Sequence, residues 1–425
     1  MIEIKPVKEL FDATVKAPPS KSYTNRALLI AALCGGKARI MNALESDDTE
    51  HMAGALRQLG VSVEKQGDIY IVCGRRGRLD APQDPIFLGN AGTAMRFLTT
   101  ACALVESGHV ILKGNERMNE RPIGDLLDAL GLLGVSAHSI KSDGCPPVLV
   151  EGGGIEGGTT KIKGDKSSQY FTSILLCAPY ARKDVVVDTV GELTSKSYID
   201  MTISSMREFG INVENDGYRS FKVKAGQVYY ARDYVVEGDF SSASYLFAAA
   251  AVTGSRVRVT GINPASAQGD KGFVGALVKM GCSRDEGPDW IEIKGPRKLK
   301  GVGEIDMNHM PDAAMTLAVV AAFGEGVTRI VNAANMRIKE TDRIAATVAE
   351  LKKMGVDASE LSDGLVVKGG DVHGAVIDTY DDHRIAMSFA VAGLRVAGVV
   401  IKDESCVSKT YPDFFGVLED IKKQI

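Results

Sequence analysis

The stretch LRQLGVSVEKQGDIYIV, residues 56–72, decides the fold of this chain because its pattern recurs along the sequence. Two apolar residues, Leu56 and Leu59, precede Gly60, and the residues after the glycine alternate around a polar turn. Glycine suits the left-handed position that ends a helix, and alternation is typical of a pair of strands. The stretch therefore predicts a helix followed by a hairpin.

The same helix ending returns at intervals of 71 to 76 residues, as LGLLGV (130–135), MREFGI (206–211), LVKMGC (277–282) and LKKMGV (351–356). A second, more apolar helix is predicted in every unit, at 26–33, 94–105, 169–178, 243–252, 313–323 and 384–394. This period is too long for a solenoid and favours compact units of strand, helix, strand, helix, strand and strand. The second helices are apolar on most faces, so we expect them to be buried.

The sixth unit is incomplete because the helix predicted at 413–425 has no hairpin after it. Residues 2–15 contain two strand-like runs, which we expect to complete this last unit. We therefore predict two globular domains of three units each, with the chain crossing between them at Pro18-Pro19-Ser20 and near 237–240. The predicted domains are 1–19 with 240–425, and 20–239. A cleft between such halves is the expected place of the active site.

Composition excludes several classes of protein. The formal charge of -4 argues against non-specific nucleic-acid binding. The seven cysteines form no CxxC pair, the six histidines do not cluster, and no apolar run approaches the roughly 18 residues of a membrane helix. We therefore expect a cytoplasmic protein without a metal, a nucleic-acid partner or a membrane partner.

Polar residues precede each predicted buried helix, at 20–22, 92–93, 167–169, 241–242, 311–312 and 382–384. The other helices begin with a similar set, at Arg117 and Arg121, 195–198, 270–271, 339–343 and 409–410. We expect Thr93 to cap the helix that follows it. Helix N-termini together with lysines and arginines predict a site for more than one anionic group.

Two acids lie within this positive charge, Asp312 and Glu340. Beside an anion site they suit proton transfer, with Lys21 as a third titratable candidate. Asp312 could instead be a helix cap, and Glu340 could pair with an arginine on its own helix. Each serine alone could be a cap, each arginine alone a surface ion pair, and His383 either a core or a positioning residue.

Nucleotide motifs are weak. The run GGGIEG at 152–157 matches a dinucleotide fingerprint, but no helix pattern follows it, so we interpret it as a loop. No GxxxxGK[ST] motif is present, and a nucleoside triphosphate is not expected.

Several motifs together resemble the enolpyruvyl transferases: APPSKSYTNRALL, LGNAGTAMR, RMNERPIGDL, SSQY, VEGDFSSASY, MNHMPDAAM, RIKETDR, DDHRIAMS and SKTYPDFF. They run from Lys21 to Phe415 and keep the family's order. The resemblance implies an α/β (α+β) fold of two domains, each of three βαβαββ units, called an inside-out α/β barrel. It also implies transfer of the enolpyruvyl group of phosphoenolpyruvate to the 5-hydroxyl of shikimate 3-phosphate, without metal or cofactor. We expect the protein to be a monomer.

The resemblance also assigns site residues. Around phosphoenolpyruvate it places Lys21, Gly92, Arg121, Gln169, Arg343, Arg384 and Lys409. Around shikimate 3-phosphate it places Ser22, Arg26, Ser167, Ser168, Gln169, Ser195, Tyr198, Asp312, Asn335 and Lys339. The expected catalytic residues are Lys21, Asp312 and Glu340, with Glu340 as the candidate for the methylene proton and Asp312 for the hydroxyl proton.

Two alternatives remain open at this point. The sister transferase that acts on UDP-N-acetylglucosamine places a reactive cysteine before the arginine that matches Arg121, where this chain has GNERMNERP. An inactive binding protein of the same fold is the other. One departure from the family is Phe97, where many members carry proline, so we hypothesise an altered response to the family's inhibitor glyphosate.

Overall fold

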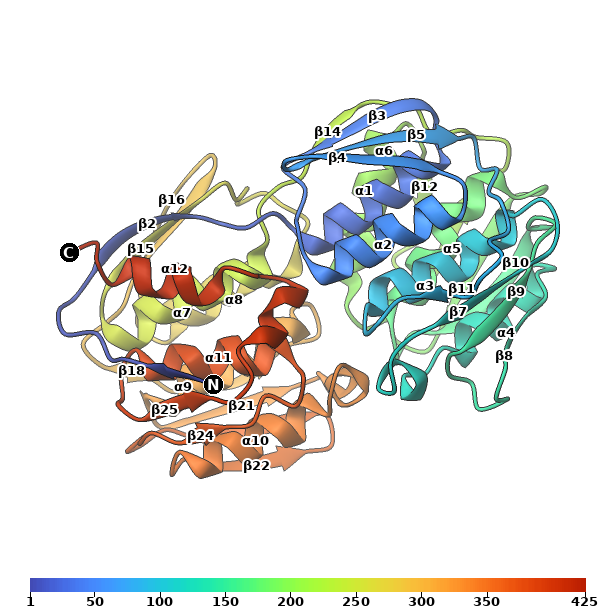
Figure 1. Cartoon of the computed structure of the whole chain (residues 1–425). Helices are drawn as coiled ribbons and strands as arrows, with labels where there is room; N and C mark the ends of the chain where they lie inside the picture. Colours follow the sequence, from blue (N-terminus) through green and yellow to red (C-terminus); the bar gives the residue numbers. More distant parts are fainter. The chain divides into compact units, whose positions relative to one another are not determined.

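The computed structural model describes residues 1–425 and divides into two compact units. The first unit consists of Met1–Pro18 and Glu237–Ile425, and the second of Pro19–Val236. These boundaries lie close in sequence to those expected at 19/20 and 239/240. In Figure 1 the second unit runs from blue to green, and the first carries the yellow to red segments with the blue N-terminus.

The second unit contains six α-helices: α1 (Lys21–Leu33), α2 (Asp47–Gln58), α3 (Gly92–Ala101), α4 (Gly124–Leu132), α5 (Ser168–Cys177) and α6 (Lys196–Glu208). Its strands are β3 (Gly35–Met41), β4 (Ser62–Gln66), β5 (Ile69–Arg75), β6 (Ile86–Phe87), β7 (His109–Lys113), β8 (Ala137–Ser139), β9 (Val148–Glu151), β10 (Gly158–Lys163), β11 (Val185–Val190), β12 (Val213–Asn215), β13 (Ser220–Val223) and β14 (Asp233–Val235).

The first unit contains α7 (Phe240–Thr253), α8 (Gly272–Lys279), α9 (Ala314–Ala322), α10 (Arg343–Lys353), α11 (His383–Gly393) and α12 (Phe414–Ile421). Its strands are β1 (Ile2–Ile4), β2 (Asp12–Lys16), β15 (Arg256–Thr260), β16 (Ser283–Gly287), β17 (Trp290–Lys294), β18 (Leu299–Lys300), β19 (Gly303–Asp306), β20 (Gly324–Glu325), β21 (Val327–Val331), β22 (Asp357–Leu361), β23 (Gly364–Lys368), β24 (Val376–Ile377) and β25 (Val399–Ile401). Short 3-10 helices include η4 (Gly269–Lys271), η5 (Pro311–Ala313), η6 (Ala334–Ile338) and η7 (Ser405–Lys409).

Five sheets share one strand order. Two parallel strands lie at one side, and a hairpin continues the sheet, with the second strand of the hairpin next to the parallel pair. These sheets are β6-β7-β9-β8, β10-β11-β13-β12, β14-β3-β5-β4, β2-β15-β17-β16 and β19-β21-β23-β22. The first two strands pair in parallel, as β10 does with β11, and the hairpin strands pair antiparallel. The predicted α/β repeat of strand, helix, strand, helix and hairpin is therefore confirmed.

The N-terminal strands differ in part from the expectation. β1 pairs with β25 and completes the sheet β1-β25-β24 of the sixth repeat, as expected. β2 does not join that sheet but pairs in parallel with β15, with Ala13 opposite Val257 (Figure 1). The prediction that both runs complete the last unit was wrong for β2. The strand that precedes α7 in the chain, β14, pairs with β3 of the second unit, so β2 supplies the missing first strand of the sheet of α7.

The apolar helices form the cores. In the first unit α7 packs against α9 and α11, and every residue of α9 and α11 is buried. In the second unit α3 packs against α1 and α5, and all ten residues of α3 are buried. Helices α2, α4, α6, α8 and α10 are amphipathic and end at glycines with positive φ, for example 81° at Gly60 and 80° at Gly355. The repeated helix ending was therefore predicted correctly.

None of these helices is both long and apolar enough to cross a membrane. The cysteines are free thiols; Cys73 is exposed, Cys145 is half-buried and the other five are buried. The run at 152–157 is a loop that leads into β10, as expected.

Candidate active site

Arg343 is the centre of a polar cluster in the first unit. It is the first residue of α10, its side chain is 1% exposed, and three carboxylates surround it. Nε lies 2.7 Å from Asp382 Oδ2, Nη1 lies 2.9 Å from Asp312 Oδ1, and Nη2 lies 2.8 Å from Glu340 Oε2. Burial lowers the pKa of Arg343, but these three carboxylates outweigh burial and raise it. The guanidinium is therefore permanently charged.

Asp312 joins a second arginine to this cluster. Its Oδ2 lies 3.0 Å from Arg384 Nη2, and Arg384 Nη1 lies 3.4 Å from the hydroxyl of Tyr245. Asp382 is the N-cap of α11 and accepts the backbone N–H of Arg384 at 2.9 Å. Asp312 does not occupy an N-cap position, because it lies inside η5 and the N-cap of α9 is Ala313. We call Asp312, Glu340, Arg343, Asp382 and Arg384 the first-unit cluster.

The other expected residues of the first unit, and the bend that carries Glu340, lie in segments next to the cluster residues in the sequence. Glu340 and Lys339 lie in the bend between η6 and α10, and Glu340 is 8% exposed. Glu340 pairs with Arg343, whereas Arg337 binds Asp342 and Glu360. Asn335 lies in η6, Lys409 is the last residue of η7, and both are buried. His383 is fully buried, with Nδ1 3.7 Å from Asp382 Oδ1.

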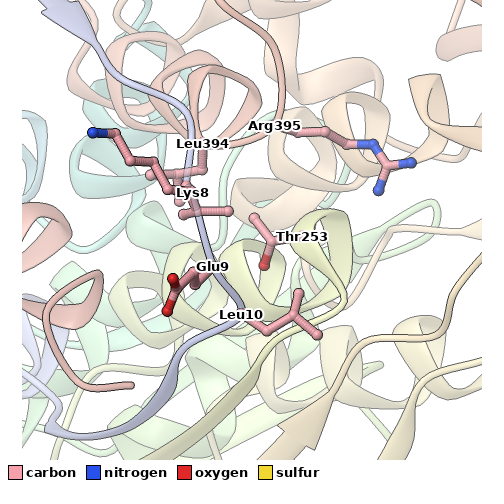
Figure 2. A pocket seen from close by; sticks show the side chains of 7 residues that line it. Lys8, Glu9, Leu10, Thr253, Leu394 and Arg395 are labelled. Atoms are coloured by element: carbon pink, nitrogen blue, oxygen red, sulfur yellow. The ribbon is translucent and has the colours of Figure 1, made fainter.

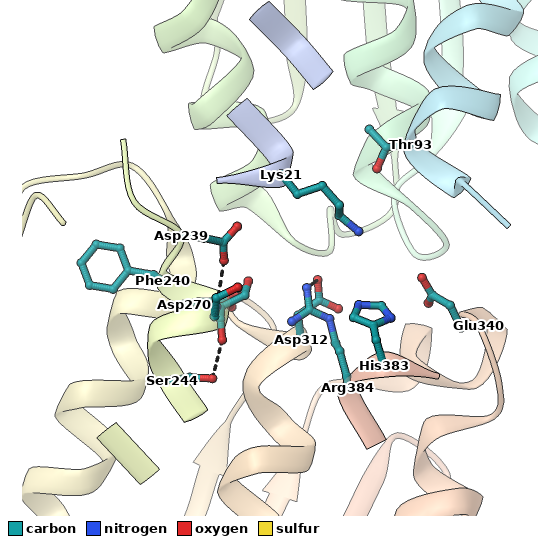
Figure 3. A network of polar contacts seen from close by, with 12 residues as sticks. Lys21, Thr93, Asp239, Phe240, Ser244, Asp270, Asp312, Glu340, His383 and Arg384 are labelled. Atoms are coloured by element: carbon teal, nitrogen blue, oxygen red, sulfur yellow. Dashed lines mark hydrogen bonds and ion pairs between the residues drawn. The ribbon is translucent and has the colours of Figure 1, made fainter. Parts of the chain in front are cut away.

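A second acid is buried near Asp312. Asp270 in η4 accepts a hydrogen bond from the hydroxyl of Ser241, and its Oδ1 is buried without a hydrogen-bond partner. Burial raises the pKa of Asp270 to about 7, and the charge of Asp312 adds to this effect. Figure 3 shows Asp270 among Asp239, Ser244 and Asp312, all on the first unit. The pKa of Asp270 is therefore displaced toward neutral pH.

Lys21 forms an ion pair in the second unit. It is the first residue of α1, which Ser20 caps, and its Nζ lies 2.9 Å from Asp48 Oδ2. The two side chains are 13% and 3% exposed. Asp48 lies in the first turn of α2, where a carboxylate interacts favourably with the helix dipole.

Arg121 faces the start of α3. Its Nη1 lies 3.0 Å from Asn90 Oδ1 and 3.4 Å from the carbonyl oxygen of Asn90. A Cβ at Gly92 would lie 2.7 Å from Arg121 Nη2, so only glycine admits the guanidinium in this position. Lys21, Asp48, Asn90, Gly92 and Arg121, together with Gln169, are called the second-unit cluster.

Thr93 does not cap α3, contrary to the expectation. The helix begins two residues earlier than predicted, at Gly92, and its N-cap Ala91 makes no side-chain cap bond. The Thr93 hydroxyl instead accepts a hydrogen bond from Gln169 Nε2 at 3.2 Å. The residue therefore ties α3 to the start of α5, where Ser167 caps the N–H of Gln169 at 3.2 Å and Ser168 is buried.

The remaining expected residues lie where α1 meets α6. Ser195 precedes α6 with φ 57°, and Tyr198 lies in its first turn. Arg26 is 1% exposed, and it donates to the carbonyl oxygens of Ser22 at 2.8 Å and Tyr198 at 3.0 Å. Through these bonds Arg26 supports the backbone of Ser22 and Tyr198. Its direct contact with substrate stays a prediction.

Phe97 is fully buried beneath Arg26. The centre of its ring lies 5.3 Å from the guanidinium carbon of Arg26, within the range of a cation–π contact. Burial lowers the pKa of Arg26 to about 10. Phe97, which stands where many family members carry proline, therefore contacts Arg26, the residue that joins α1 to α6.

Four residues were not predicted from the sequence as members or partners of the site: Asp48, Asn90, Asp382 as a partner of Arg343, and Asp270. Each lies at a helix start, and Asp382 and Asp270 stand in polar groups that the sequence does pick out. Their partners, however, lie far away in the sequence, as with Arg343 and Asp382.

An open hollow of about 490 Å³ lies elsewhere on the first unit (Figure 2). Its lining consists of Val7, Lys8, Glu9, Leu10, Thr253, Leu394 and Arg395. None of the expected site residues lines it. The structure contains no group of three or more His, Cys, Asp or Glu side chains that could hold a metal ion.

Comparisons with known proteins agree with this architecture. The sequence model of EPSP synthase (3-phosphoshikimate 1-carboxyvinyltransferase) matches residues 5–418. The chain is 46% identical to a 3-phosphoshikimate 1-carboxyvinyltransferase of Sulfurovum sp. (strain NBC37-1) over 99% of both chains, and 46% identical to that of Shewanella pealeana over 97% of both. A solved EPSP synthase of Acinetobacter baumannii superposes with a TM-score of 0.82 at 27% identity, covering 99% of this chain and 97% of that one. By its sequence over nearly its whole length and by its fold, the chain belongs to the EPSP synthase family.

Proposed function

We propose that this protein transfers the enolpyruvyl group of phosphoenolpyruvate to the 5-hydroxyl of shikimate 3-phosphate and releases phosphate, a step in making chorismate and the aromatic amino acids. Family membership supports the reaction. The observation that carries it at the level of residues is the first-unit cluster, where two buried arginines hold Asp312 and Glu340 at 2.8 to 3.0 Å. Such a cluster offers both cations for an anionic substrate and carboxylates for proton transfer.

The reaction requires two proton transfers. The methylene carbon of phosphoenolpyruvate gains a proton while the substrate hydroxyl attacks the neighbouring carbon and loses its own proton. The resulting methyl group then gives up a proton as the C–O bond to phosphate breaks, which restores the double bond. We assign the carbon-bound proton to Glu340 and the hydroxyl proton to Asp312, helped by Lys21.

Phosphoenolpyruvate is expected to bind Lys21, Gly92, Arg121, Gln169, Arg343, Arg384 and Lys409. Arg121 supports this assignment because its charge is bound only by the side chain and carbonyl of Asn90, so no carboxylate neutralises it. Shikimate 3-phosphate is expected to bind Ser22, Arg26, Ser167, Ser168, Gln169, Ser195, Tyr198, Asp312, Asn335 and Lys339. Fixed cations and helix N-termini would balance the charge of the departing phosphate.

A phosphate-release assay tests the function. We expect turnover with phosphoenolpyruvate and shikimate 3-phosphate together, and none when UDP-N-acetylglucosamine replaces shikimate 3-phosphate. Turnover with the sugar nucleotide alone would favour the sister transferase, and no turnover with either acceptor would favour an inactive binding protein. The segment 114–122 holds no cysteine, so no observation favours the sister reaction.

We further propose that the protein works as a monomer in the cytoplasm without a metal or cofactor. Its seven free thiols support a reducing compartment. Light scattering of the purified protein, and turnover in the presence of a chelator, test the two remaining points.

A further inference from the structure

The chain just before Asp382 and Arg384 has an unusual backbone. Tyr380 and Asp381 both have positive φ, 57° and 54°. A residue other than glycine in this region costs on the order of 1 kcal/mol or more, and persists only where its surroundings hold it. The turn ends where the N–H of Asp382 donates to the carbonyl of Thr379 at 2.9 Å.

Glu350 on α10 holds this turn in place. Its side chain is 0% exposed, and its carboxylate accepts the hydroxyl of Tyr380 at 2.7 Å and the N–H of Asp378 at 3.1 Å. Lys353 Nζ contacts the two carboxylate oxygens at 2.8 and 2.9 Å. A buried carboxylate is costly unless its oxygens are bonded, and these contacts satisfy both.

Helix α10 therefore grips one segment at two points. Near its start Arg343 binds Asp382 at 2.7 Å, and about two turns later Glu350 binds Tyr380 and the backbone of Asp378. Asp378 is itself held by Lys353 and Lys402, each at 2.6 Å. The segment that carries Asp382 and Arg384 into α11 is thus fixed at both of its ends.

The contacts that hold the turn at 380–381 stay intact around neutral pH. Burial and the hydrogen bond to Glu350 raise the pKa of Tyr380 to about 12, so its hydroxyl remains a donor. Lys353 and Lys402 lower the pKa of Asp378, which keeps that carboxylate charged.

From this geometry we infer that Glu350 and Tyr380 are positioning residues, which hold the strained turn at 380–381 so that Arg384 and Asp382 keep their places in the first-unit cluster. Neither residue is expected to touch a substrate. The inference rests on the proposed function, because it assigns Arg384 to phosphoenolpyruvate. Without the hydroxyl of Tyr380 the turn would relax toward negative φ and shift the start of α11.

The variant Tyr380→Phe removes one hydroxyl and keeps the ring. We expect the KM for phosphoenolpyruvate to rise roughly fivefold, as the loss of one positioning hydrogen bond would allow. The KM for shikimate 3-phosphate should stay unchanged, because most of its expected contacts lie in the second unit. Steady-state phosphate release with each substrate varied in turn measures both constants.

Tyr70→Phe is the matched control. Tyr70 donates to Glu50 at 2.6 Å, beside Lys65, so the variant removes the same kind of bond in the second unit. It should leave both KM values unchanged. Glu350→Gln serves as a second variant and should raise the same KM as Tyr380→Phe.

An unchanged KM for phosphoenolpyruvate in Tyr380→Phe, or an equal rise in both KM values, would overturn the inference even if the variant unfolds at a lower temperature. Turnover of the wild-type protein in the same assay tests the proposed function separately. Failure of this positioning role alone would therefore appear as normal wild-type turnover with no selective effect of Tyr380→Phe.

Discussion

The two polar clusters bind their arginines through different groups. In the first unit, Arg343 and Arg384 are bound by the carboxylates of Asp312, Glu340 and Asp382. In the second unit, Arg121 is bound by the amide and carbonyl oxygens of Asn90, and only Lys21 has a carboxylate partner, Asp48.

This difference indicates a division of labour. An arginine paired with neutral oxygens keeps its whole charge available for an anion, whereas an arginine among carboxylates also holds those acids in place. We therefore expect the second-unit cluster to contribute mainly to binding anions and the first-unit cluster mainly to proton transfer. The following variants test that contrast, from the largest expected effect to the smallest.

Arg343→Met should have the largest effect, on stability as well as turnover. It leaves the buried carboxylates of Glu340 and Asp382 and the half-buried one of Asp312 without their common cation, which should lower the free energy of unfolding by about 3 to 5 kcal/mol. Denaturant unfolding measures this loss. Arg337→Met is the control, because Arg337 also binds two carboxylates, Asp342 and Glu360, but at the surface. A cost below about 2 kcal/mol is expected there, and equal costs for the two variants would contradict the role of Arg343.

Glu340→Gln should keep the fold and substrate binding and lose most turnover. The amide preserves the shape of the side chain but cannot deliver the methylene proton, a loss of about 100-fold or more in kcat. Phosphate release gives kcat, and calorimetry with shikimate 3-phosphate checks binding. Phosphate release near the wild-type rate would remove Glu340 from the catalytic residues.

Asp270→Asn should change how stability depends on pH. The pKa of Asp270 is about 7 in the folded protein against an ordinary value of 3.8, so its protonated form stabilises the fold at low pH. That contribution is lost as the pH rises through about 7. Relative to wild type, the variant should therefore gain more than about 1 kcal/mol of stability between about pH 5 and about pH 8. Thermal unfolding at the two pH values measures this difference. If the stability of wild type and of the variant changes by the same amount between them, the raised pKa of Asp270 is refuted.

Gly92→Ala should have the smallest effect and should act on binding alone. The added Cβ would lie 2.7 Å from Arg121 Nη2, and the flexible guanidinium would have to move away. We expect the KM for phosphoenolpyruvate to rise by roughly threefold to tenfold at unchanged melting temperature. Gly131→Ala is the control, since Gly131 lies in α4 with open space around its Cβ position. If both alanines behave alike, Gly92 does not set the place of Arg121.

The repeat architecture could be predicted from the sequence because its signals are local. A helix ending at Gly60 and an almost entirely apolar helix at 313–323 are visible within a few residues of sequence. The partners within the clusters could not be predicted, because they depend on packing between distant segments. Nothing near Lys21 indicates Asp48 as its partner, and Glu340 had two arginines within reach on its own segment.

Local rules also failed where tertiary contacts compete. Thr93 has the side chain of a cap, yet its hydroxyl accepts a hydrogen bond from Gln169 on α5 while α3 begins at Gly92. The strand at 12–16 was assigned to the wrong sheet, because strand character does not reveal which of two sheets lacks a first strand.

The pairing of β1 and β2 sets an order for folding during synthesis. The second unit can assemble once residue 236 has left the ribosome, since β14 is its last strand. β2 must wait for β15, and β1 must wait for β25 near the other end of the chain. Through most of translation the first sixteen residues therefore carry unpaired strand edges, which are prone to association with other chains. Residues 2–16 are therefore made before the second unit but find their pairing partners only after it.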